Sequence, residues 1–190
     1  VLSFYAIDDY LTCPQKFKYG HVLRVPLAPH HSLIYGSAIH SAVAEFHRRH
    51  ARGEVMTEDQ LVAVFQATWK SEGFLSREHE EERLRAGDEM LRRFHAEEAK
   101  APWSPTAVEE EFAFVLERNR VQGRYDLVIE REGEVAIVDF KTGDVRDEKA
   151  AQKRAKESLQ LDIYALAHLK TKGRLPGRVE LRFLASGRVA

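Results

Sequence analysis

Three consecutive β-type stretches, separated by short turns, constrain the fold of this chain most strongly. They are β-branched or alternate between apolar and polar residues, and they span 108–116, 121–129 and 134–139. Such a pattern predicts an antiparallel meander. Helical periodicity returns from Asp147 to about Lys170, and a last β-type stretch follows at 179–184. Because a helical crossover joins parallel strands, we expect 179–184 to lie parallel to the strand that ends at Asp139.

The N-terminal half of the chain is helical in pattern. Helices are expected over residues 4–11 with Ser3 as the N-cap, 36–51, 57–69 and 78–100. Pro102 and Pro105 end this half. We therefore predict an α/β fold in one domain, 1–190, in which residues 57–101 form an inserted helical lobe. The start at Val1 and the end at Ala190 favour a domain excised from a larger protein.

The amino-acid composition limits the kinds of molecule that this chain is expected to bind. Lys+Arg (29) nearly balance Asp+Glu (30), so a polyanion would have to be bound by local clusters or by metal ions. No apolar run reaches the length of a membrane span and no signal peptide is recognisable, so no membrane partner is expected. The single cysteine excludes an internal disulfide framework and favours a cytoplasmic setting. We expect Cys13 to be a small buried hydrophobic residue.

The third β-type stretch ends in a charged pair. Residues 134–143 read EVAIVDFKTG, and strand alternation places Asp139 and Lys141 on one face with Phe140 on the other. In a hairpin, Asp126 of the preceding strand would come near Asp139. Two adjacent carboxylates repel each other, and Mg²⁺ or Mn²⁺ relieves that repulsion. Lys141 would then polarise a scissile phosphate or orient water. The alternative is a solvated strand end with a simple ion pair.

A histidine near the start of a predicted helix is a further candidate ligand. His40 follows Gly36-Ser37-Ala38-Ile39, and its ring would lie at the edge of the core, where a neutral imidazole can bind a metal. A structural or exposed histidine is the alternative. His47 and His50 lie on the same helix without a carboxylate at the spacing of a zinc site, so we interpret both as surface residues.

Residues of the later helix are candidates for contact with nucleic acid. Gln160 and Tyr164 are one turn apart and share a face, where an amide and a phenol can bind and stack on a nucleotide. A half-buried tyrosine beside a polar neighbour is the alternative. The basic residues just before them would collect a phosphate backbone or form a solvated face. They are Lys149, Lys153, Arg154 and Lys156.

Taken together, the motifs resemble one enzyme family. In chain order they are Gly36-x-x-x-His40, Val108-Glu109, Gly123-x-x-Asp126, Asp139-x-Lys141-Thr-Gly and Gln160-x-x-x-Tyr164. Their order and spacing resemble the RecB-type branch of the PD-(D/E)XK nuclease superfamily over nearly the whole chain. The resemblance implies a restriction-endonuclease-like α/β core with a mixed central sheet flanked by helices.

The resemblance also implies roles for individual residues. His40, Asp126 and Asp139 would hold the Mg²⁺ or Mn²⁺ ion, with the Phe140 carbonyl as a further ligand. Lys141 would be the catalytic lysine, and Asp126 and Asp139 would share in catalysis. Gln160 and Tyr164 would help to place the DNA, with Lys153 and Arg154 nearby. The family's glutamate before the meander falls on Glu109, with Glu110 and Glu111 as alternatives.

The function implied is that of a metal-dependent DNA nuclease. An exonuclease that acts on single-stranded DNA ends in recombination or repair is expected, partnered with a helicase motor in cis or in trans. The alternative is a catalytically silent DNA-binding module of a helicase–nuclease assembly. Some relatives carry an iron–sulfur cluster on four cysteines. Because Cys13 is the single cysteine here, no such cluster is expected within this chain.

Overall fold

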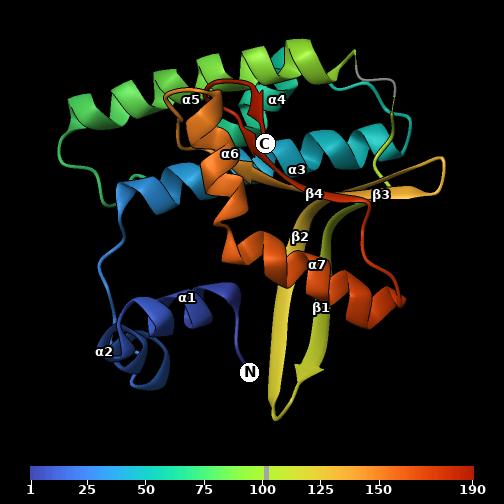
Figure 1. Ribbon diagram of the computed structural model, residues 1–190. Helices are drawn as coiled ribbons and strands as arrows, with labels where there is room; N and C mark the ends of the chain where they lie inside the picture. Colours follow the sequence, from blue (N-terminus) through green and yellow to red (C-terminus); the bar gives the residue numbers. More distant parts are fainter. Residues whose placement is uncertain (101–102) are drawn as a thin grey trace.

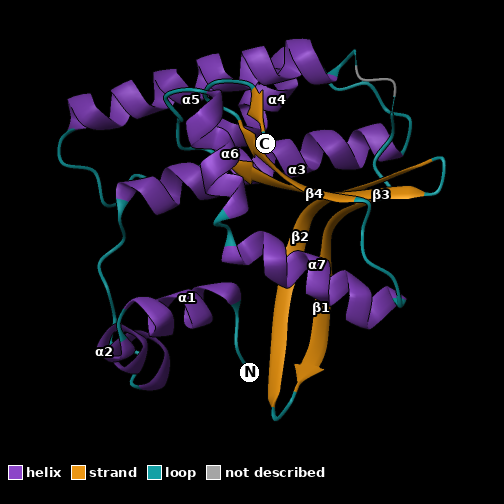
Figure 2. Cartoon of the chain, in the orientation of Figure 1, coloured by secondary structure: helices purple, strands orange, loops and turns teal. Residues whose placement is uncertain are grey.

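A mixed five-stranded sheet with helices on both faces forms the core of the computed structural model, which describes residues 1–100 and 103–190 (Figures 1 and 2). The strands are β1 (Ala107–Leu116), β2 (Asn119–Arg131), β3 (Glu134–Lys141), β4 (Arg178–Phe183) and β5 (Arg188–Val189). The helices are α1 (Phe4–Thr12), α2 (Pro14–Phe17), the π-helix η1 (Lys18–Val22), α3 (His31–Ala51), α4 (Glu58–Thr68), α5 (Arg77–Glu98), α6 (Glu148–Lys156) and α7 (Leu159–Lys172). The predicted α/β architecture is confirmed. Pro102, expected to end the helical half, lies outside the described residues.

Strand pairing follows the order of the chain. β1, β2 and β3 pair as an antiparallel meander, and β4 pairs in parallel with β3 after the crossover through α6 and α7. Both features were predicted from the sequence. The antiparallel β5 was not, because two residues carry no periodic signal.

Two apolar layers hold the helices on the sheet (Figure 1). One contains α3, α4 and α5, whose side chains pack with residues such as Leu127 and Val138. The other contains α6 and α7, packed on residues such as Ile137 and Phe183. Helices α4 and α5 thus share a core with the sheet. That residues 57–101 are an insertion stays a prediction.

The β1–β2 hairpin leaves the sheet at one point. β2 pairs with β3 from Leu127 to Arg131, and the pairing ends where Leu127 lies opposite Val138. The rest of the hairpin projects away from β3 and β4 as a two-stranded ribbon (Figure 1). Beyond the branch, residues 139–141 of β3 form no strand pairing with β2 within the described part of the chain. The Phe140 amide donates instead to Asp126 Oδ2 at 2.9 Å.

Several helices differ from the prediction. Residues 147–170 form α6 and α7 rather than one helix, because Ser158 caps α7 through a hydrogen bond from the Leu161 amide. α3 begins at His31 and not at Gly36. Within the described residues, no helix combines the length and the apolarity that crossing a bilayer requires.

Two residues occupy environments opposite to those expected. Cys13 is exposed, because the chain turns there from α1 directly into α2 instead of entering the core. His47 is fully buried, and its ring stacks against Phe140 at 5.6 Å and against Trp103 at 5.6 Å between centroids. His47 is therefore a core residue and not a surface residue. Aromatic partners from distant parts of the chain create that environment.

His47 is expected to make folding stability depend on pH. Burial, with a smaller contribution from Arg182, lowers the pKa of His47 from 6.5 to about 3. Below pH 6.5 the unfolded chain binds a proton that the folded chain does not, so the stability present above pH 6.5 is lost as the pH falls toward 3. We expect a loss of about 1.4 kcal/mol of unfolding free energy per pH unit, measured by urea unfolding in EDTA. His47→Phe should lack this part of the slope. Equal slopes in both proteins would contradict the assignment.

A side chain at Gly87 is expected to destabilise the fold. An ideal Cβ there would lie 2.4 Å from Phe65 Cζ in the interface of α4 and α5. Because Phe65 is fully buried, we expect Gly87→Ala to lower the unfolding free energy by about 1–3 kcal/mol, despite the better helix propensity of alanine. Gly20→Ala is the control, since its added Cβ would meet no side chain or more distant backbone of the described residues within 4 Å. A Gly87→Ala protein as stable as wild type in urea would contradict the close packing.

Candidate active site

A cleft of about 880 Å³ opens where the hairpin leaves the sheet. Its walls come from the helices α1, α3, α6 and α7 and from the strands β1 to β4. The cleft brings together most of the residues that the sequence singled out. They are His40, Glu109, Asp126, Asp139, Phe140, Lys141, Arg154, Gln160 and Tyr164.

Asp126 and Asp139 lie on neighbouring strands at the branch point. Continuing the register of β2 and β3 by one position places them opposite each other. Burial, followed by repulsion from the Asp139 carboxylate, raises the pKa of Asp126 from 3.8 to about 6. His40 Nδ1 lies 3.4 Å from Asp126 Oδ2 and offsets part of this effect. The site therefore concentrates negative charge that a cation would compensate.

Asp139 is the most heavily bonded carboxylate of the cleft. Gln160 Nε2 donates to Asp139 Oδ1 at 2.6 Å, and Tyr164 Oη donates to the same oxygen at 3.2 Å. Lys141 Nζ lies 2.8 Å from Asp139 Oδ2 and donates to Gln160 Oε1 at 2.7 Å. Gln160 thus links the acid and the lysine and fixes both in one orientation.

Gln160 and Tyr164 are buried beneath this pair rather than displayed on the surface. Tyr164 also donates to the Arg124 carbonyl at 2.9 Å. Burial, followed by the charge of Asp139, raises the pKa of Tyr164, so its hydroxyl keeps its proton as a donor. The structure shows both residues supporting Asp139. Their contact with DNA stays a prediction.

The donor set fits a divalent cation. Asp139 Oδ2 is buried and, apart from the ion pair with Lys141, has no partner with hydrogen-bond geometry among the described residues. The two carboxylates and one imidazole are the ligand types that Mg²⁺ and Mn²⁺ accept. Among residues 1–100 and 103–190, no three such side chains are already grouped around one point. Cation binding would therefore change the contacts of Asp139.

Phe140 separates Asp139 from Lys141 and anchors the strand end. Its ring is buried in the apolar layer on the side of α3 and α5, where it meets Phe94 and His47. This agrees with the predicted alternation along β3. Its carbonyl as a metal ligand stays a prediction.

Two arginines bind the Glu109 carboxylate. The backbone of Glu109 is left-handed, with φ of 51°, and the residue lies on β1 between Val108 and Glu110, which pair with Leu127 and Tyr125 of β2. Its carboxylate pairs with Arg48 of α3 and, at 2.9 Å from Oε1 to Nη2, with Arg124 of β2. Neither arginine was selected from the sequence, because nothing in the local pattern shows that they converge on one carboxylate.

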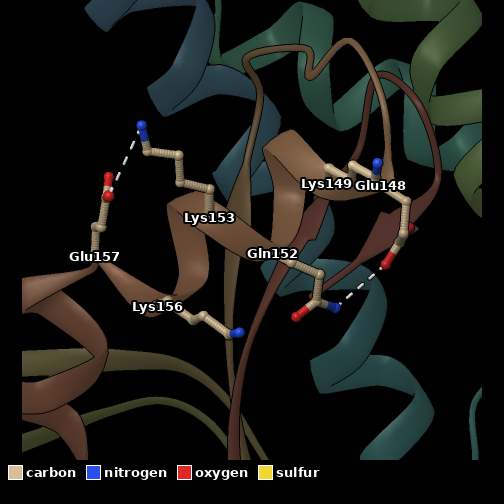
Figure 3. A pocket seen from close by; sticks show the side chains of 6 residues that line it. All are labelled: Glu148, Lys149, Gln152, Lys153, Lys156 and Glu157. Atoms are coloured by element: carbon tan, nitrogen blue, oxygen red, sulfur yellow. Dashed lines mark hydrogen bonds and ion pairs between the residues drawn. The ribbon is translucent and has the colours of Figure 1, made fainter.

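The basic residues of α6 divide between two surfaces. Arg154 lines the cleft, with its guanidinium 5.9 Å from the centre of the Phe183 ring. Lys153 instead borders a separate hollow lined by residues of α6 and by Glu157, and its Nζ lies 3.9 Å from Glu157 Oε1 (Figure 3). The two residues are neighbours in the sequence but not in the site.

The chain was compared with known protein families and with curated proteins. The family model of the PD-(D/E)XK nuclease superfamily matches residues 1–188. The chain therefore belongs to this superfamily, whose members generally use Mg²⁺ or Mn²⁺. A search of curated proteins found no match. Membership indicates a nuclease with a DNA substrate.

Proposed function

We propose that this chain is a metal-dependent deoxyribonuclease of the RecB type. The observation that supports it best is the geometry of the branch point, where Asp126 faces Asp139 and Lys141 lies 2.8 Å from Asp139 in an open cleft. A simple ion pair does not require a second carboxylate with a raised pKa beside it. A buried acid with a raised pKa in a cleft is typical of catalytic sites.

The proposed reaction is hydrolysis of a phosphodiester bond. Asp126, Asp139 and His40 would hold the cation, with the Phe140 carbonyl as a further ligand. The bound ion would neutralise phosphate charge and lower the pKa of the attacking water. Lys141, whose side chain is 35% exposed, contacts a phosphoryl oxygen and stabilises the charge that develops when water adds to phosphorus and the leaving oxygen departs. Gln160 and Tyr164 keep Asp139 oriented throughout.

A single-stranded end is the proposed substrate. Tyr5 lines the cleft with 66% of its surface exposed, and an exposed aromatic ring offers a stacking surface to an unpaired base. Arg154 would contact the backbone inside the cleft, with Lys153 further along α6. We place the activity in DNA recombination or repair with a helicase motor, on the resemblance to RecB-type domains.

Cleavage of labelled DNA tests the proposal. We expect Mg²⁺ or Mn²⁺ to support degradation of a 5′- or 3′-labelled single strand and EDTA to abolish it. A covalently closed single-stranded circle is the control and should survive if a free end is needed. Cleavage of the circle would show that the protein is an endonuclease and not an exonuclease. DNA binding without cleavage in either cation would favour the catalytically silent module.

A further inference from the structure

Arg124 is placed to bind substrate and has few competing contacts. Its side chain is 53% exposed and lines the cleft two residues before Asp126 on β2. Among the described residues, its guanidinium forms an ion pair with Glu109 and with no other acid. A guanidinium has five donors, so most of them stay available. The planar shape and the positive charge of a guanidinium suit it to bind phosphate oxygens.

The backbone of Arg124 is tied to the catalytic carboxylate. The single hydroxyl proton of Tyr164 is shared between two acceptors, the Arg124 carbonyl at 2.9 Å and Asp139 Oδ1 at 3.2 Å from Oη. One hydroxyl therefore fixes the distance between this point of β2 and the reacting end of β3. A phosphate bound by Arg124 would have a defined position relative to Asp139.

Glu109 holds the Arg124 side chain from the opposite strand. Glu109 has a left-handed backbone, and its side chain is 20% exposed. Its carboxylate lies between the guanidiniums of Arg48 and Arg124. Arg48, which also lies 3.9 Å from Glu45, comes from α3 two turns after His40. Because Arg48 neutralises much of the Glu109 charge, Arg124 keeps a net attraction for an anion.

We propose that Arg124 binds a backbone phosphate next to the scissile one and that Glu109 is the residue that positions it. This rests on the proposed nuclease function and adds a substrate contact to it. Glu109 then acts through Arg124 and is not a metal ligand. In this proposal the cleft beside Arg124 binds a nucleic-acid strand.

Arg124→Met tests the phosphate contact, with Arg120→Met as the matched control on an exposed part of the same strand. Steady-state cleavage should show KM raised about 10-fold with kcat nearly unchanged. Binding of a fluorescent single strand in EDTA should lose about 0.7 from the slope of log K against log salt. Arg120→Met should match wild type. A KM and a salt slope in Arg124→Met equal to those of the control would overturn the proposal.

Glu109→Gln tests the positioning role. We expect its Mn²⁺ affinity, measured by calorimetry, to equal that of wild type while KM for DNA rises. Weakened Mn²⁺ binding would overturn the role and make Glu109 a ligand. The slope of log K against log salt is measured in EDTA, where no cleavage takes place. It therefore tests Arg124 even if the wild-type protein cleaves nothing. Cleavage by wild type with unchanged slopes would reject this inference alone.

Discussion

Asp139→Asn is expected to abolish cleavage while leaving the fold intact. Asparagine has the shape of aspartate and can still accept from Gln160 and Tyr164 through its amide oxygen. It removes the negative charge that pairs with Lys141 and would bind the cation. We expect the cleavage rate constant to fall by at least about 1000-fold, measured in single-turnover reactions.

Asp162→Asn is the matched control for this change. Asp162 lies on the exposed side of α7, so the same loss of charge occurs on the helix that carries Gln160 but outside the cleft. Its cleavage rate should match wild type. Circular dichroism and urea unfolding should show that both variants fold. A folded Asp139→Asn protein with wild-type cleavage would exclude this carboxylate from the reaction.

Lys141→Ala is expected to lower cleavage without removing the cation site. The ammonium is the positive side chain nearest to Asp139, and loss of one such charged contact costs about 3–4 kcal/mol of barrier, or roughly 100- to 1000-fold in rate. Because Asp126, Asp139 and His40 are unchanged, we expect Mn²⁺ binding to persist. Calorimetry of Mn²⁺ binding, together with single-turnover cleavage, measures both quantities.

Lys70→Ala controls for the loss of a lysine. Lys70 is exposed between α4 and α5, away from the cleft residues. Its cleavage should equal that of wild type. If Lys141→Ala cleaved at the wild-type rate, Lys141 would be a structural partner of Asp139 and not a catalytic residue. If Lys141→Ala lost Mn²⁺ binding, Lys141 would be needed for the cation site in addition to the carboxylates.

The positions of Asp126, Asp139 and Lys141 relative to one another could be predicted from the sequence, because these residues are close together in the chain. Strand alternation places Asp139 and Lys141 together, and a short hairpin brings Asp126 opposite Asp139. The crossover length predicts the parallel β4. Each of these inferences depends on residues that are close in the chain or on a connection of known handedness.

The residues that were missed depend on contacts between distant segments. Arg48 and Arg124 meet at Glu109 only after α3 packs beside β1 and β2. His47 is buried by aromatic rings from α5 and β3, which no helical pattern around it reveals. The contacts of the Gln160 amide with Asp139 and Lys141 were likewise not foreseen, while its role in placing DNA stays a prediction. Tertiary packing, not local propensity, decides these positions.

The dependence of cleavage on Mn²⁺ concentration, compared between wild type and Asp126→Asn, tests most directly whether a cation at the Asp126–Asp139 pair carries the reaction. We predict no cleavage in EDTA and a saturable rise with Mn²⁺ for wild type. In Asp126→Asn, saturation should move to at least about 10-fold higher Mn²⁺, since loss of a charged ligand weakens the site. Cleavage in EDTA, or identical Mn²⁺ curves for the two proteins, would contradict the proposed site.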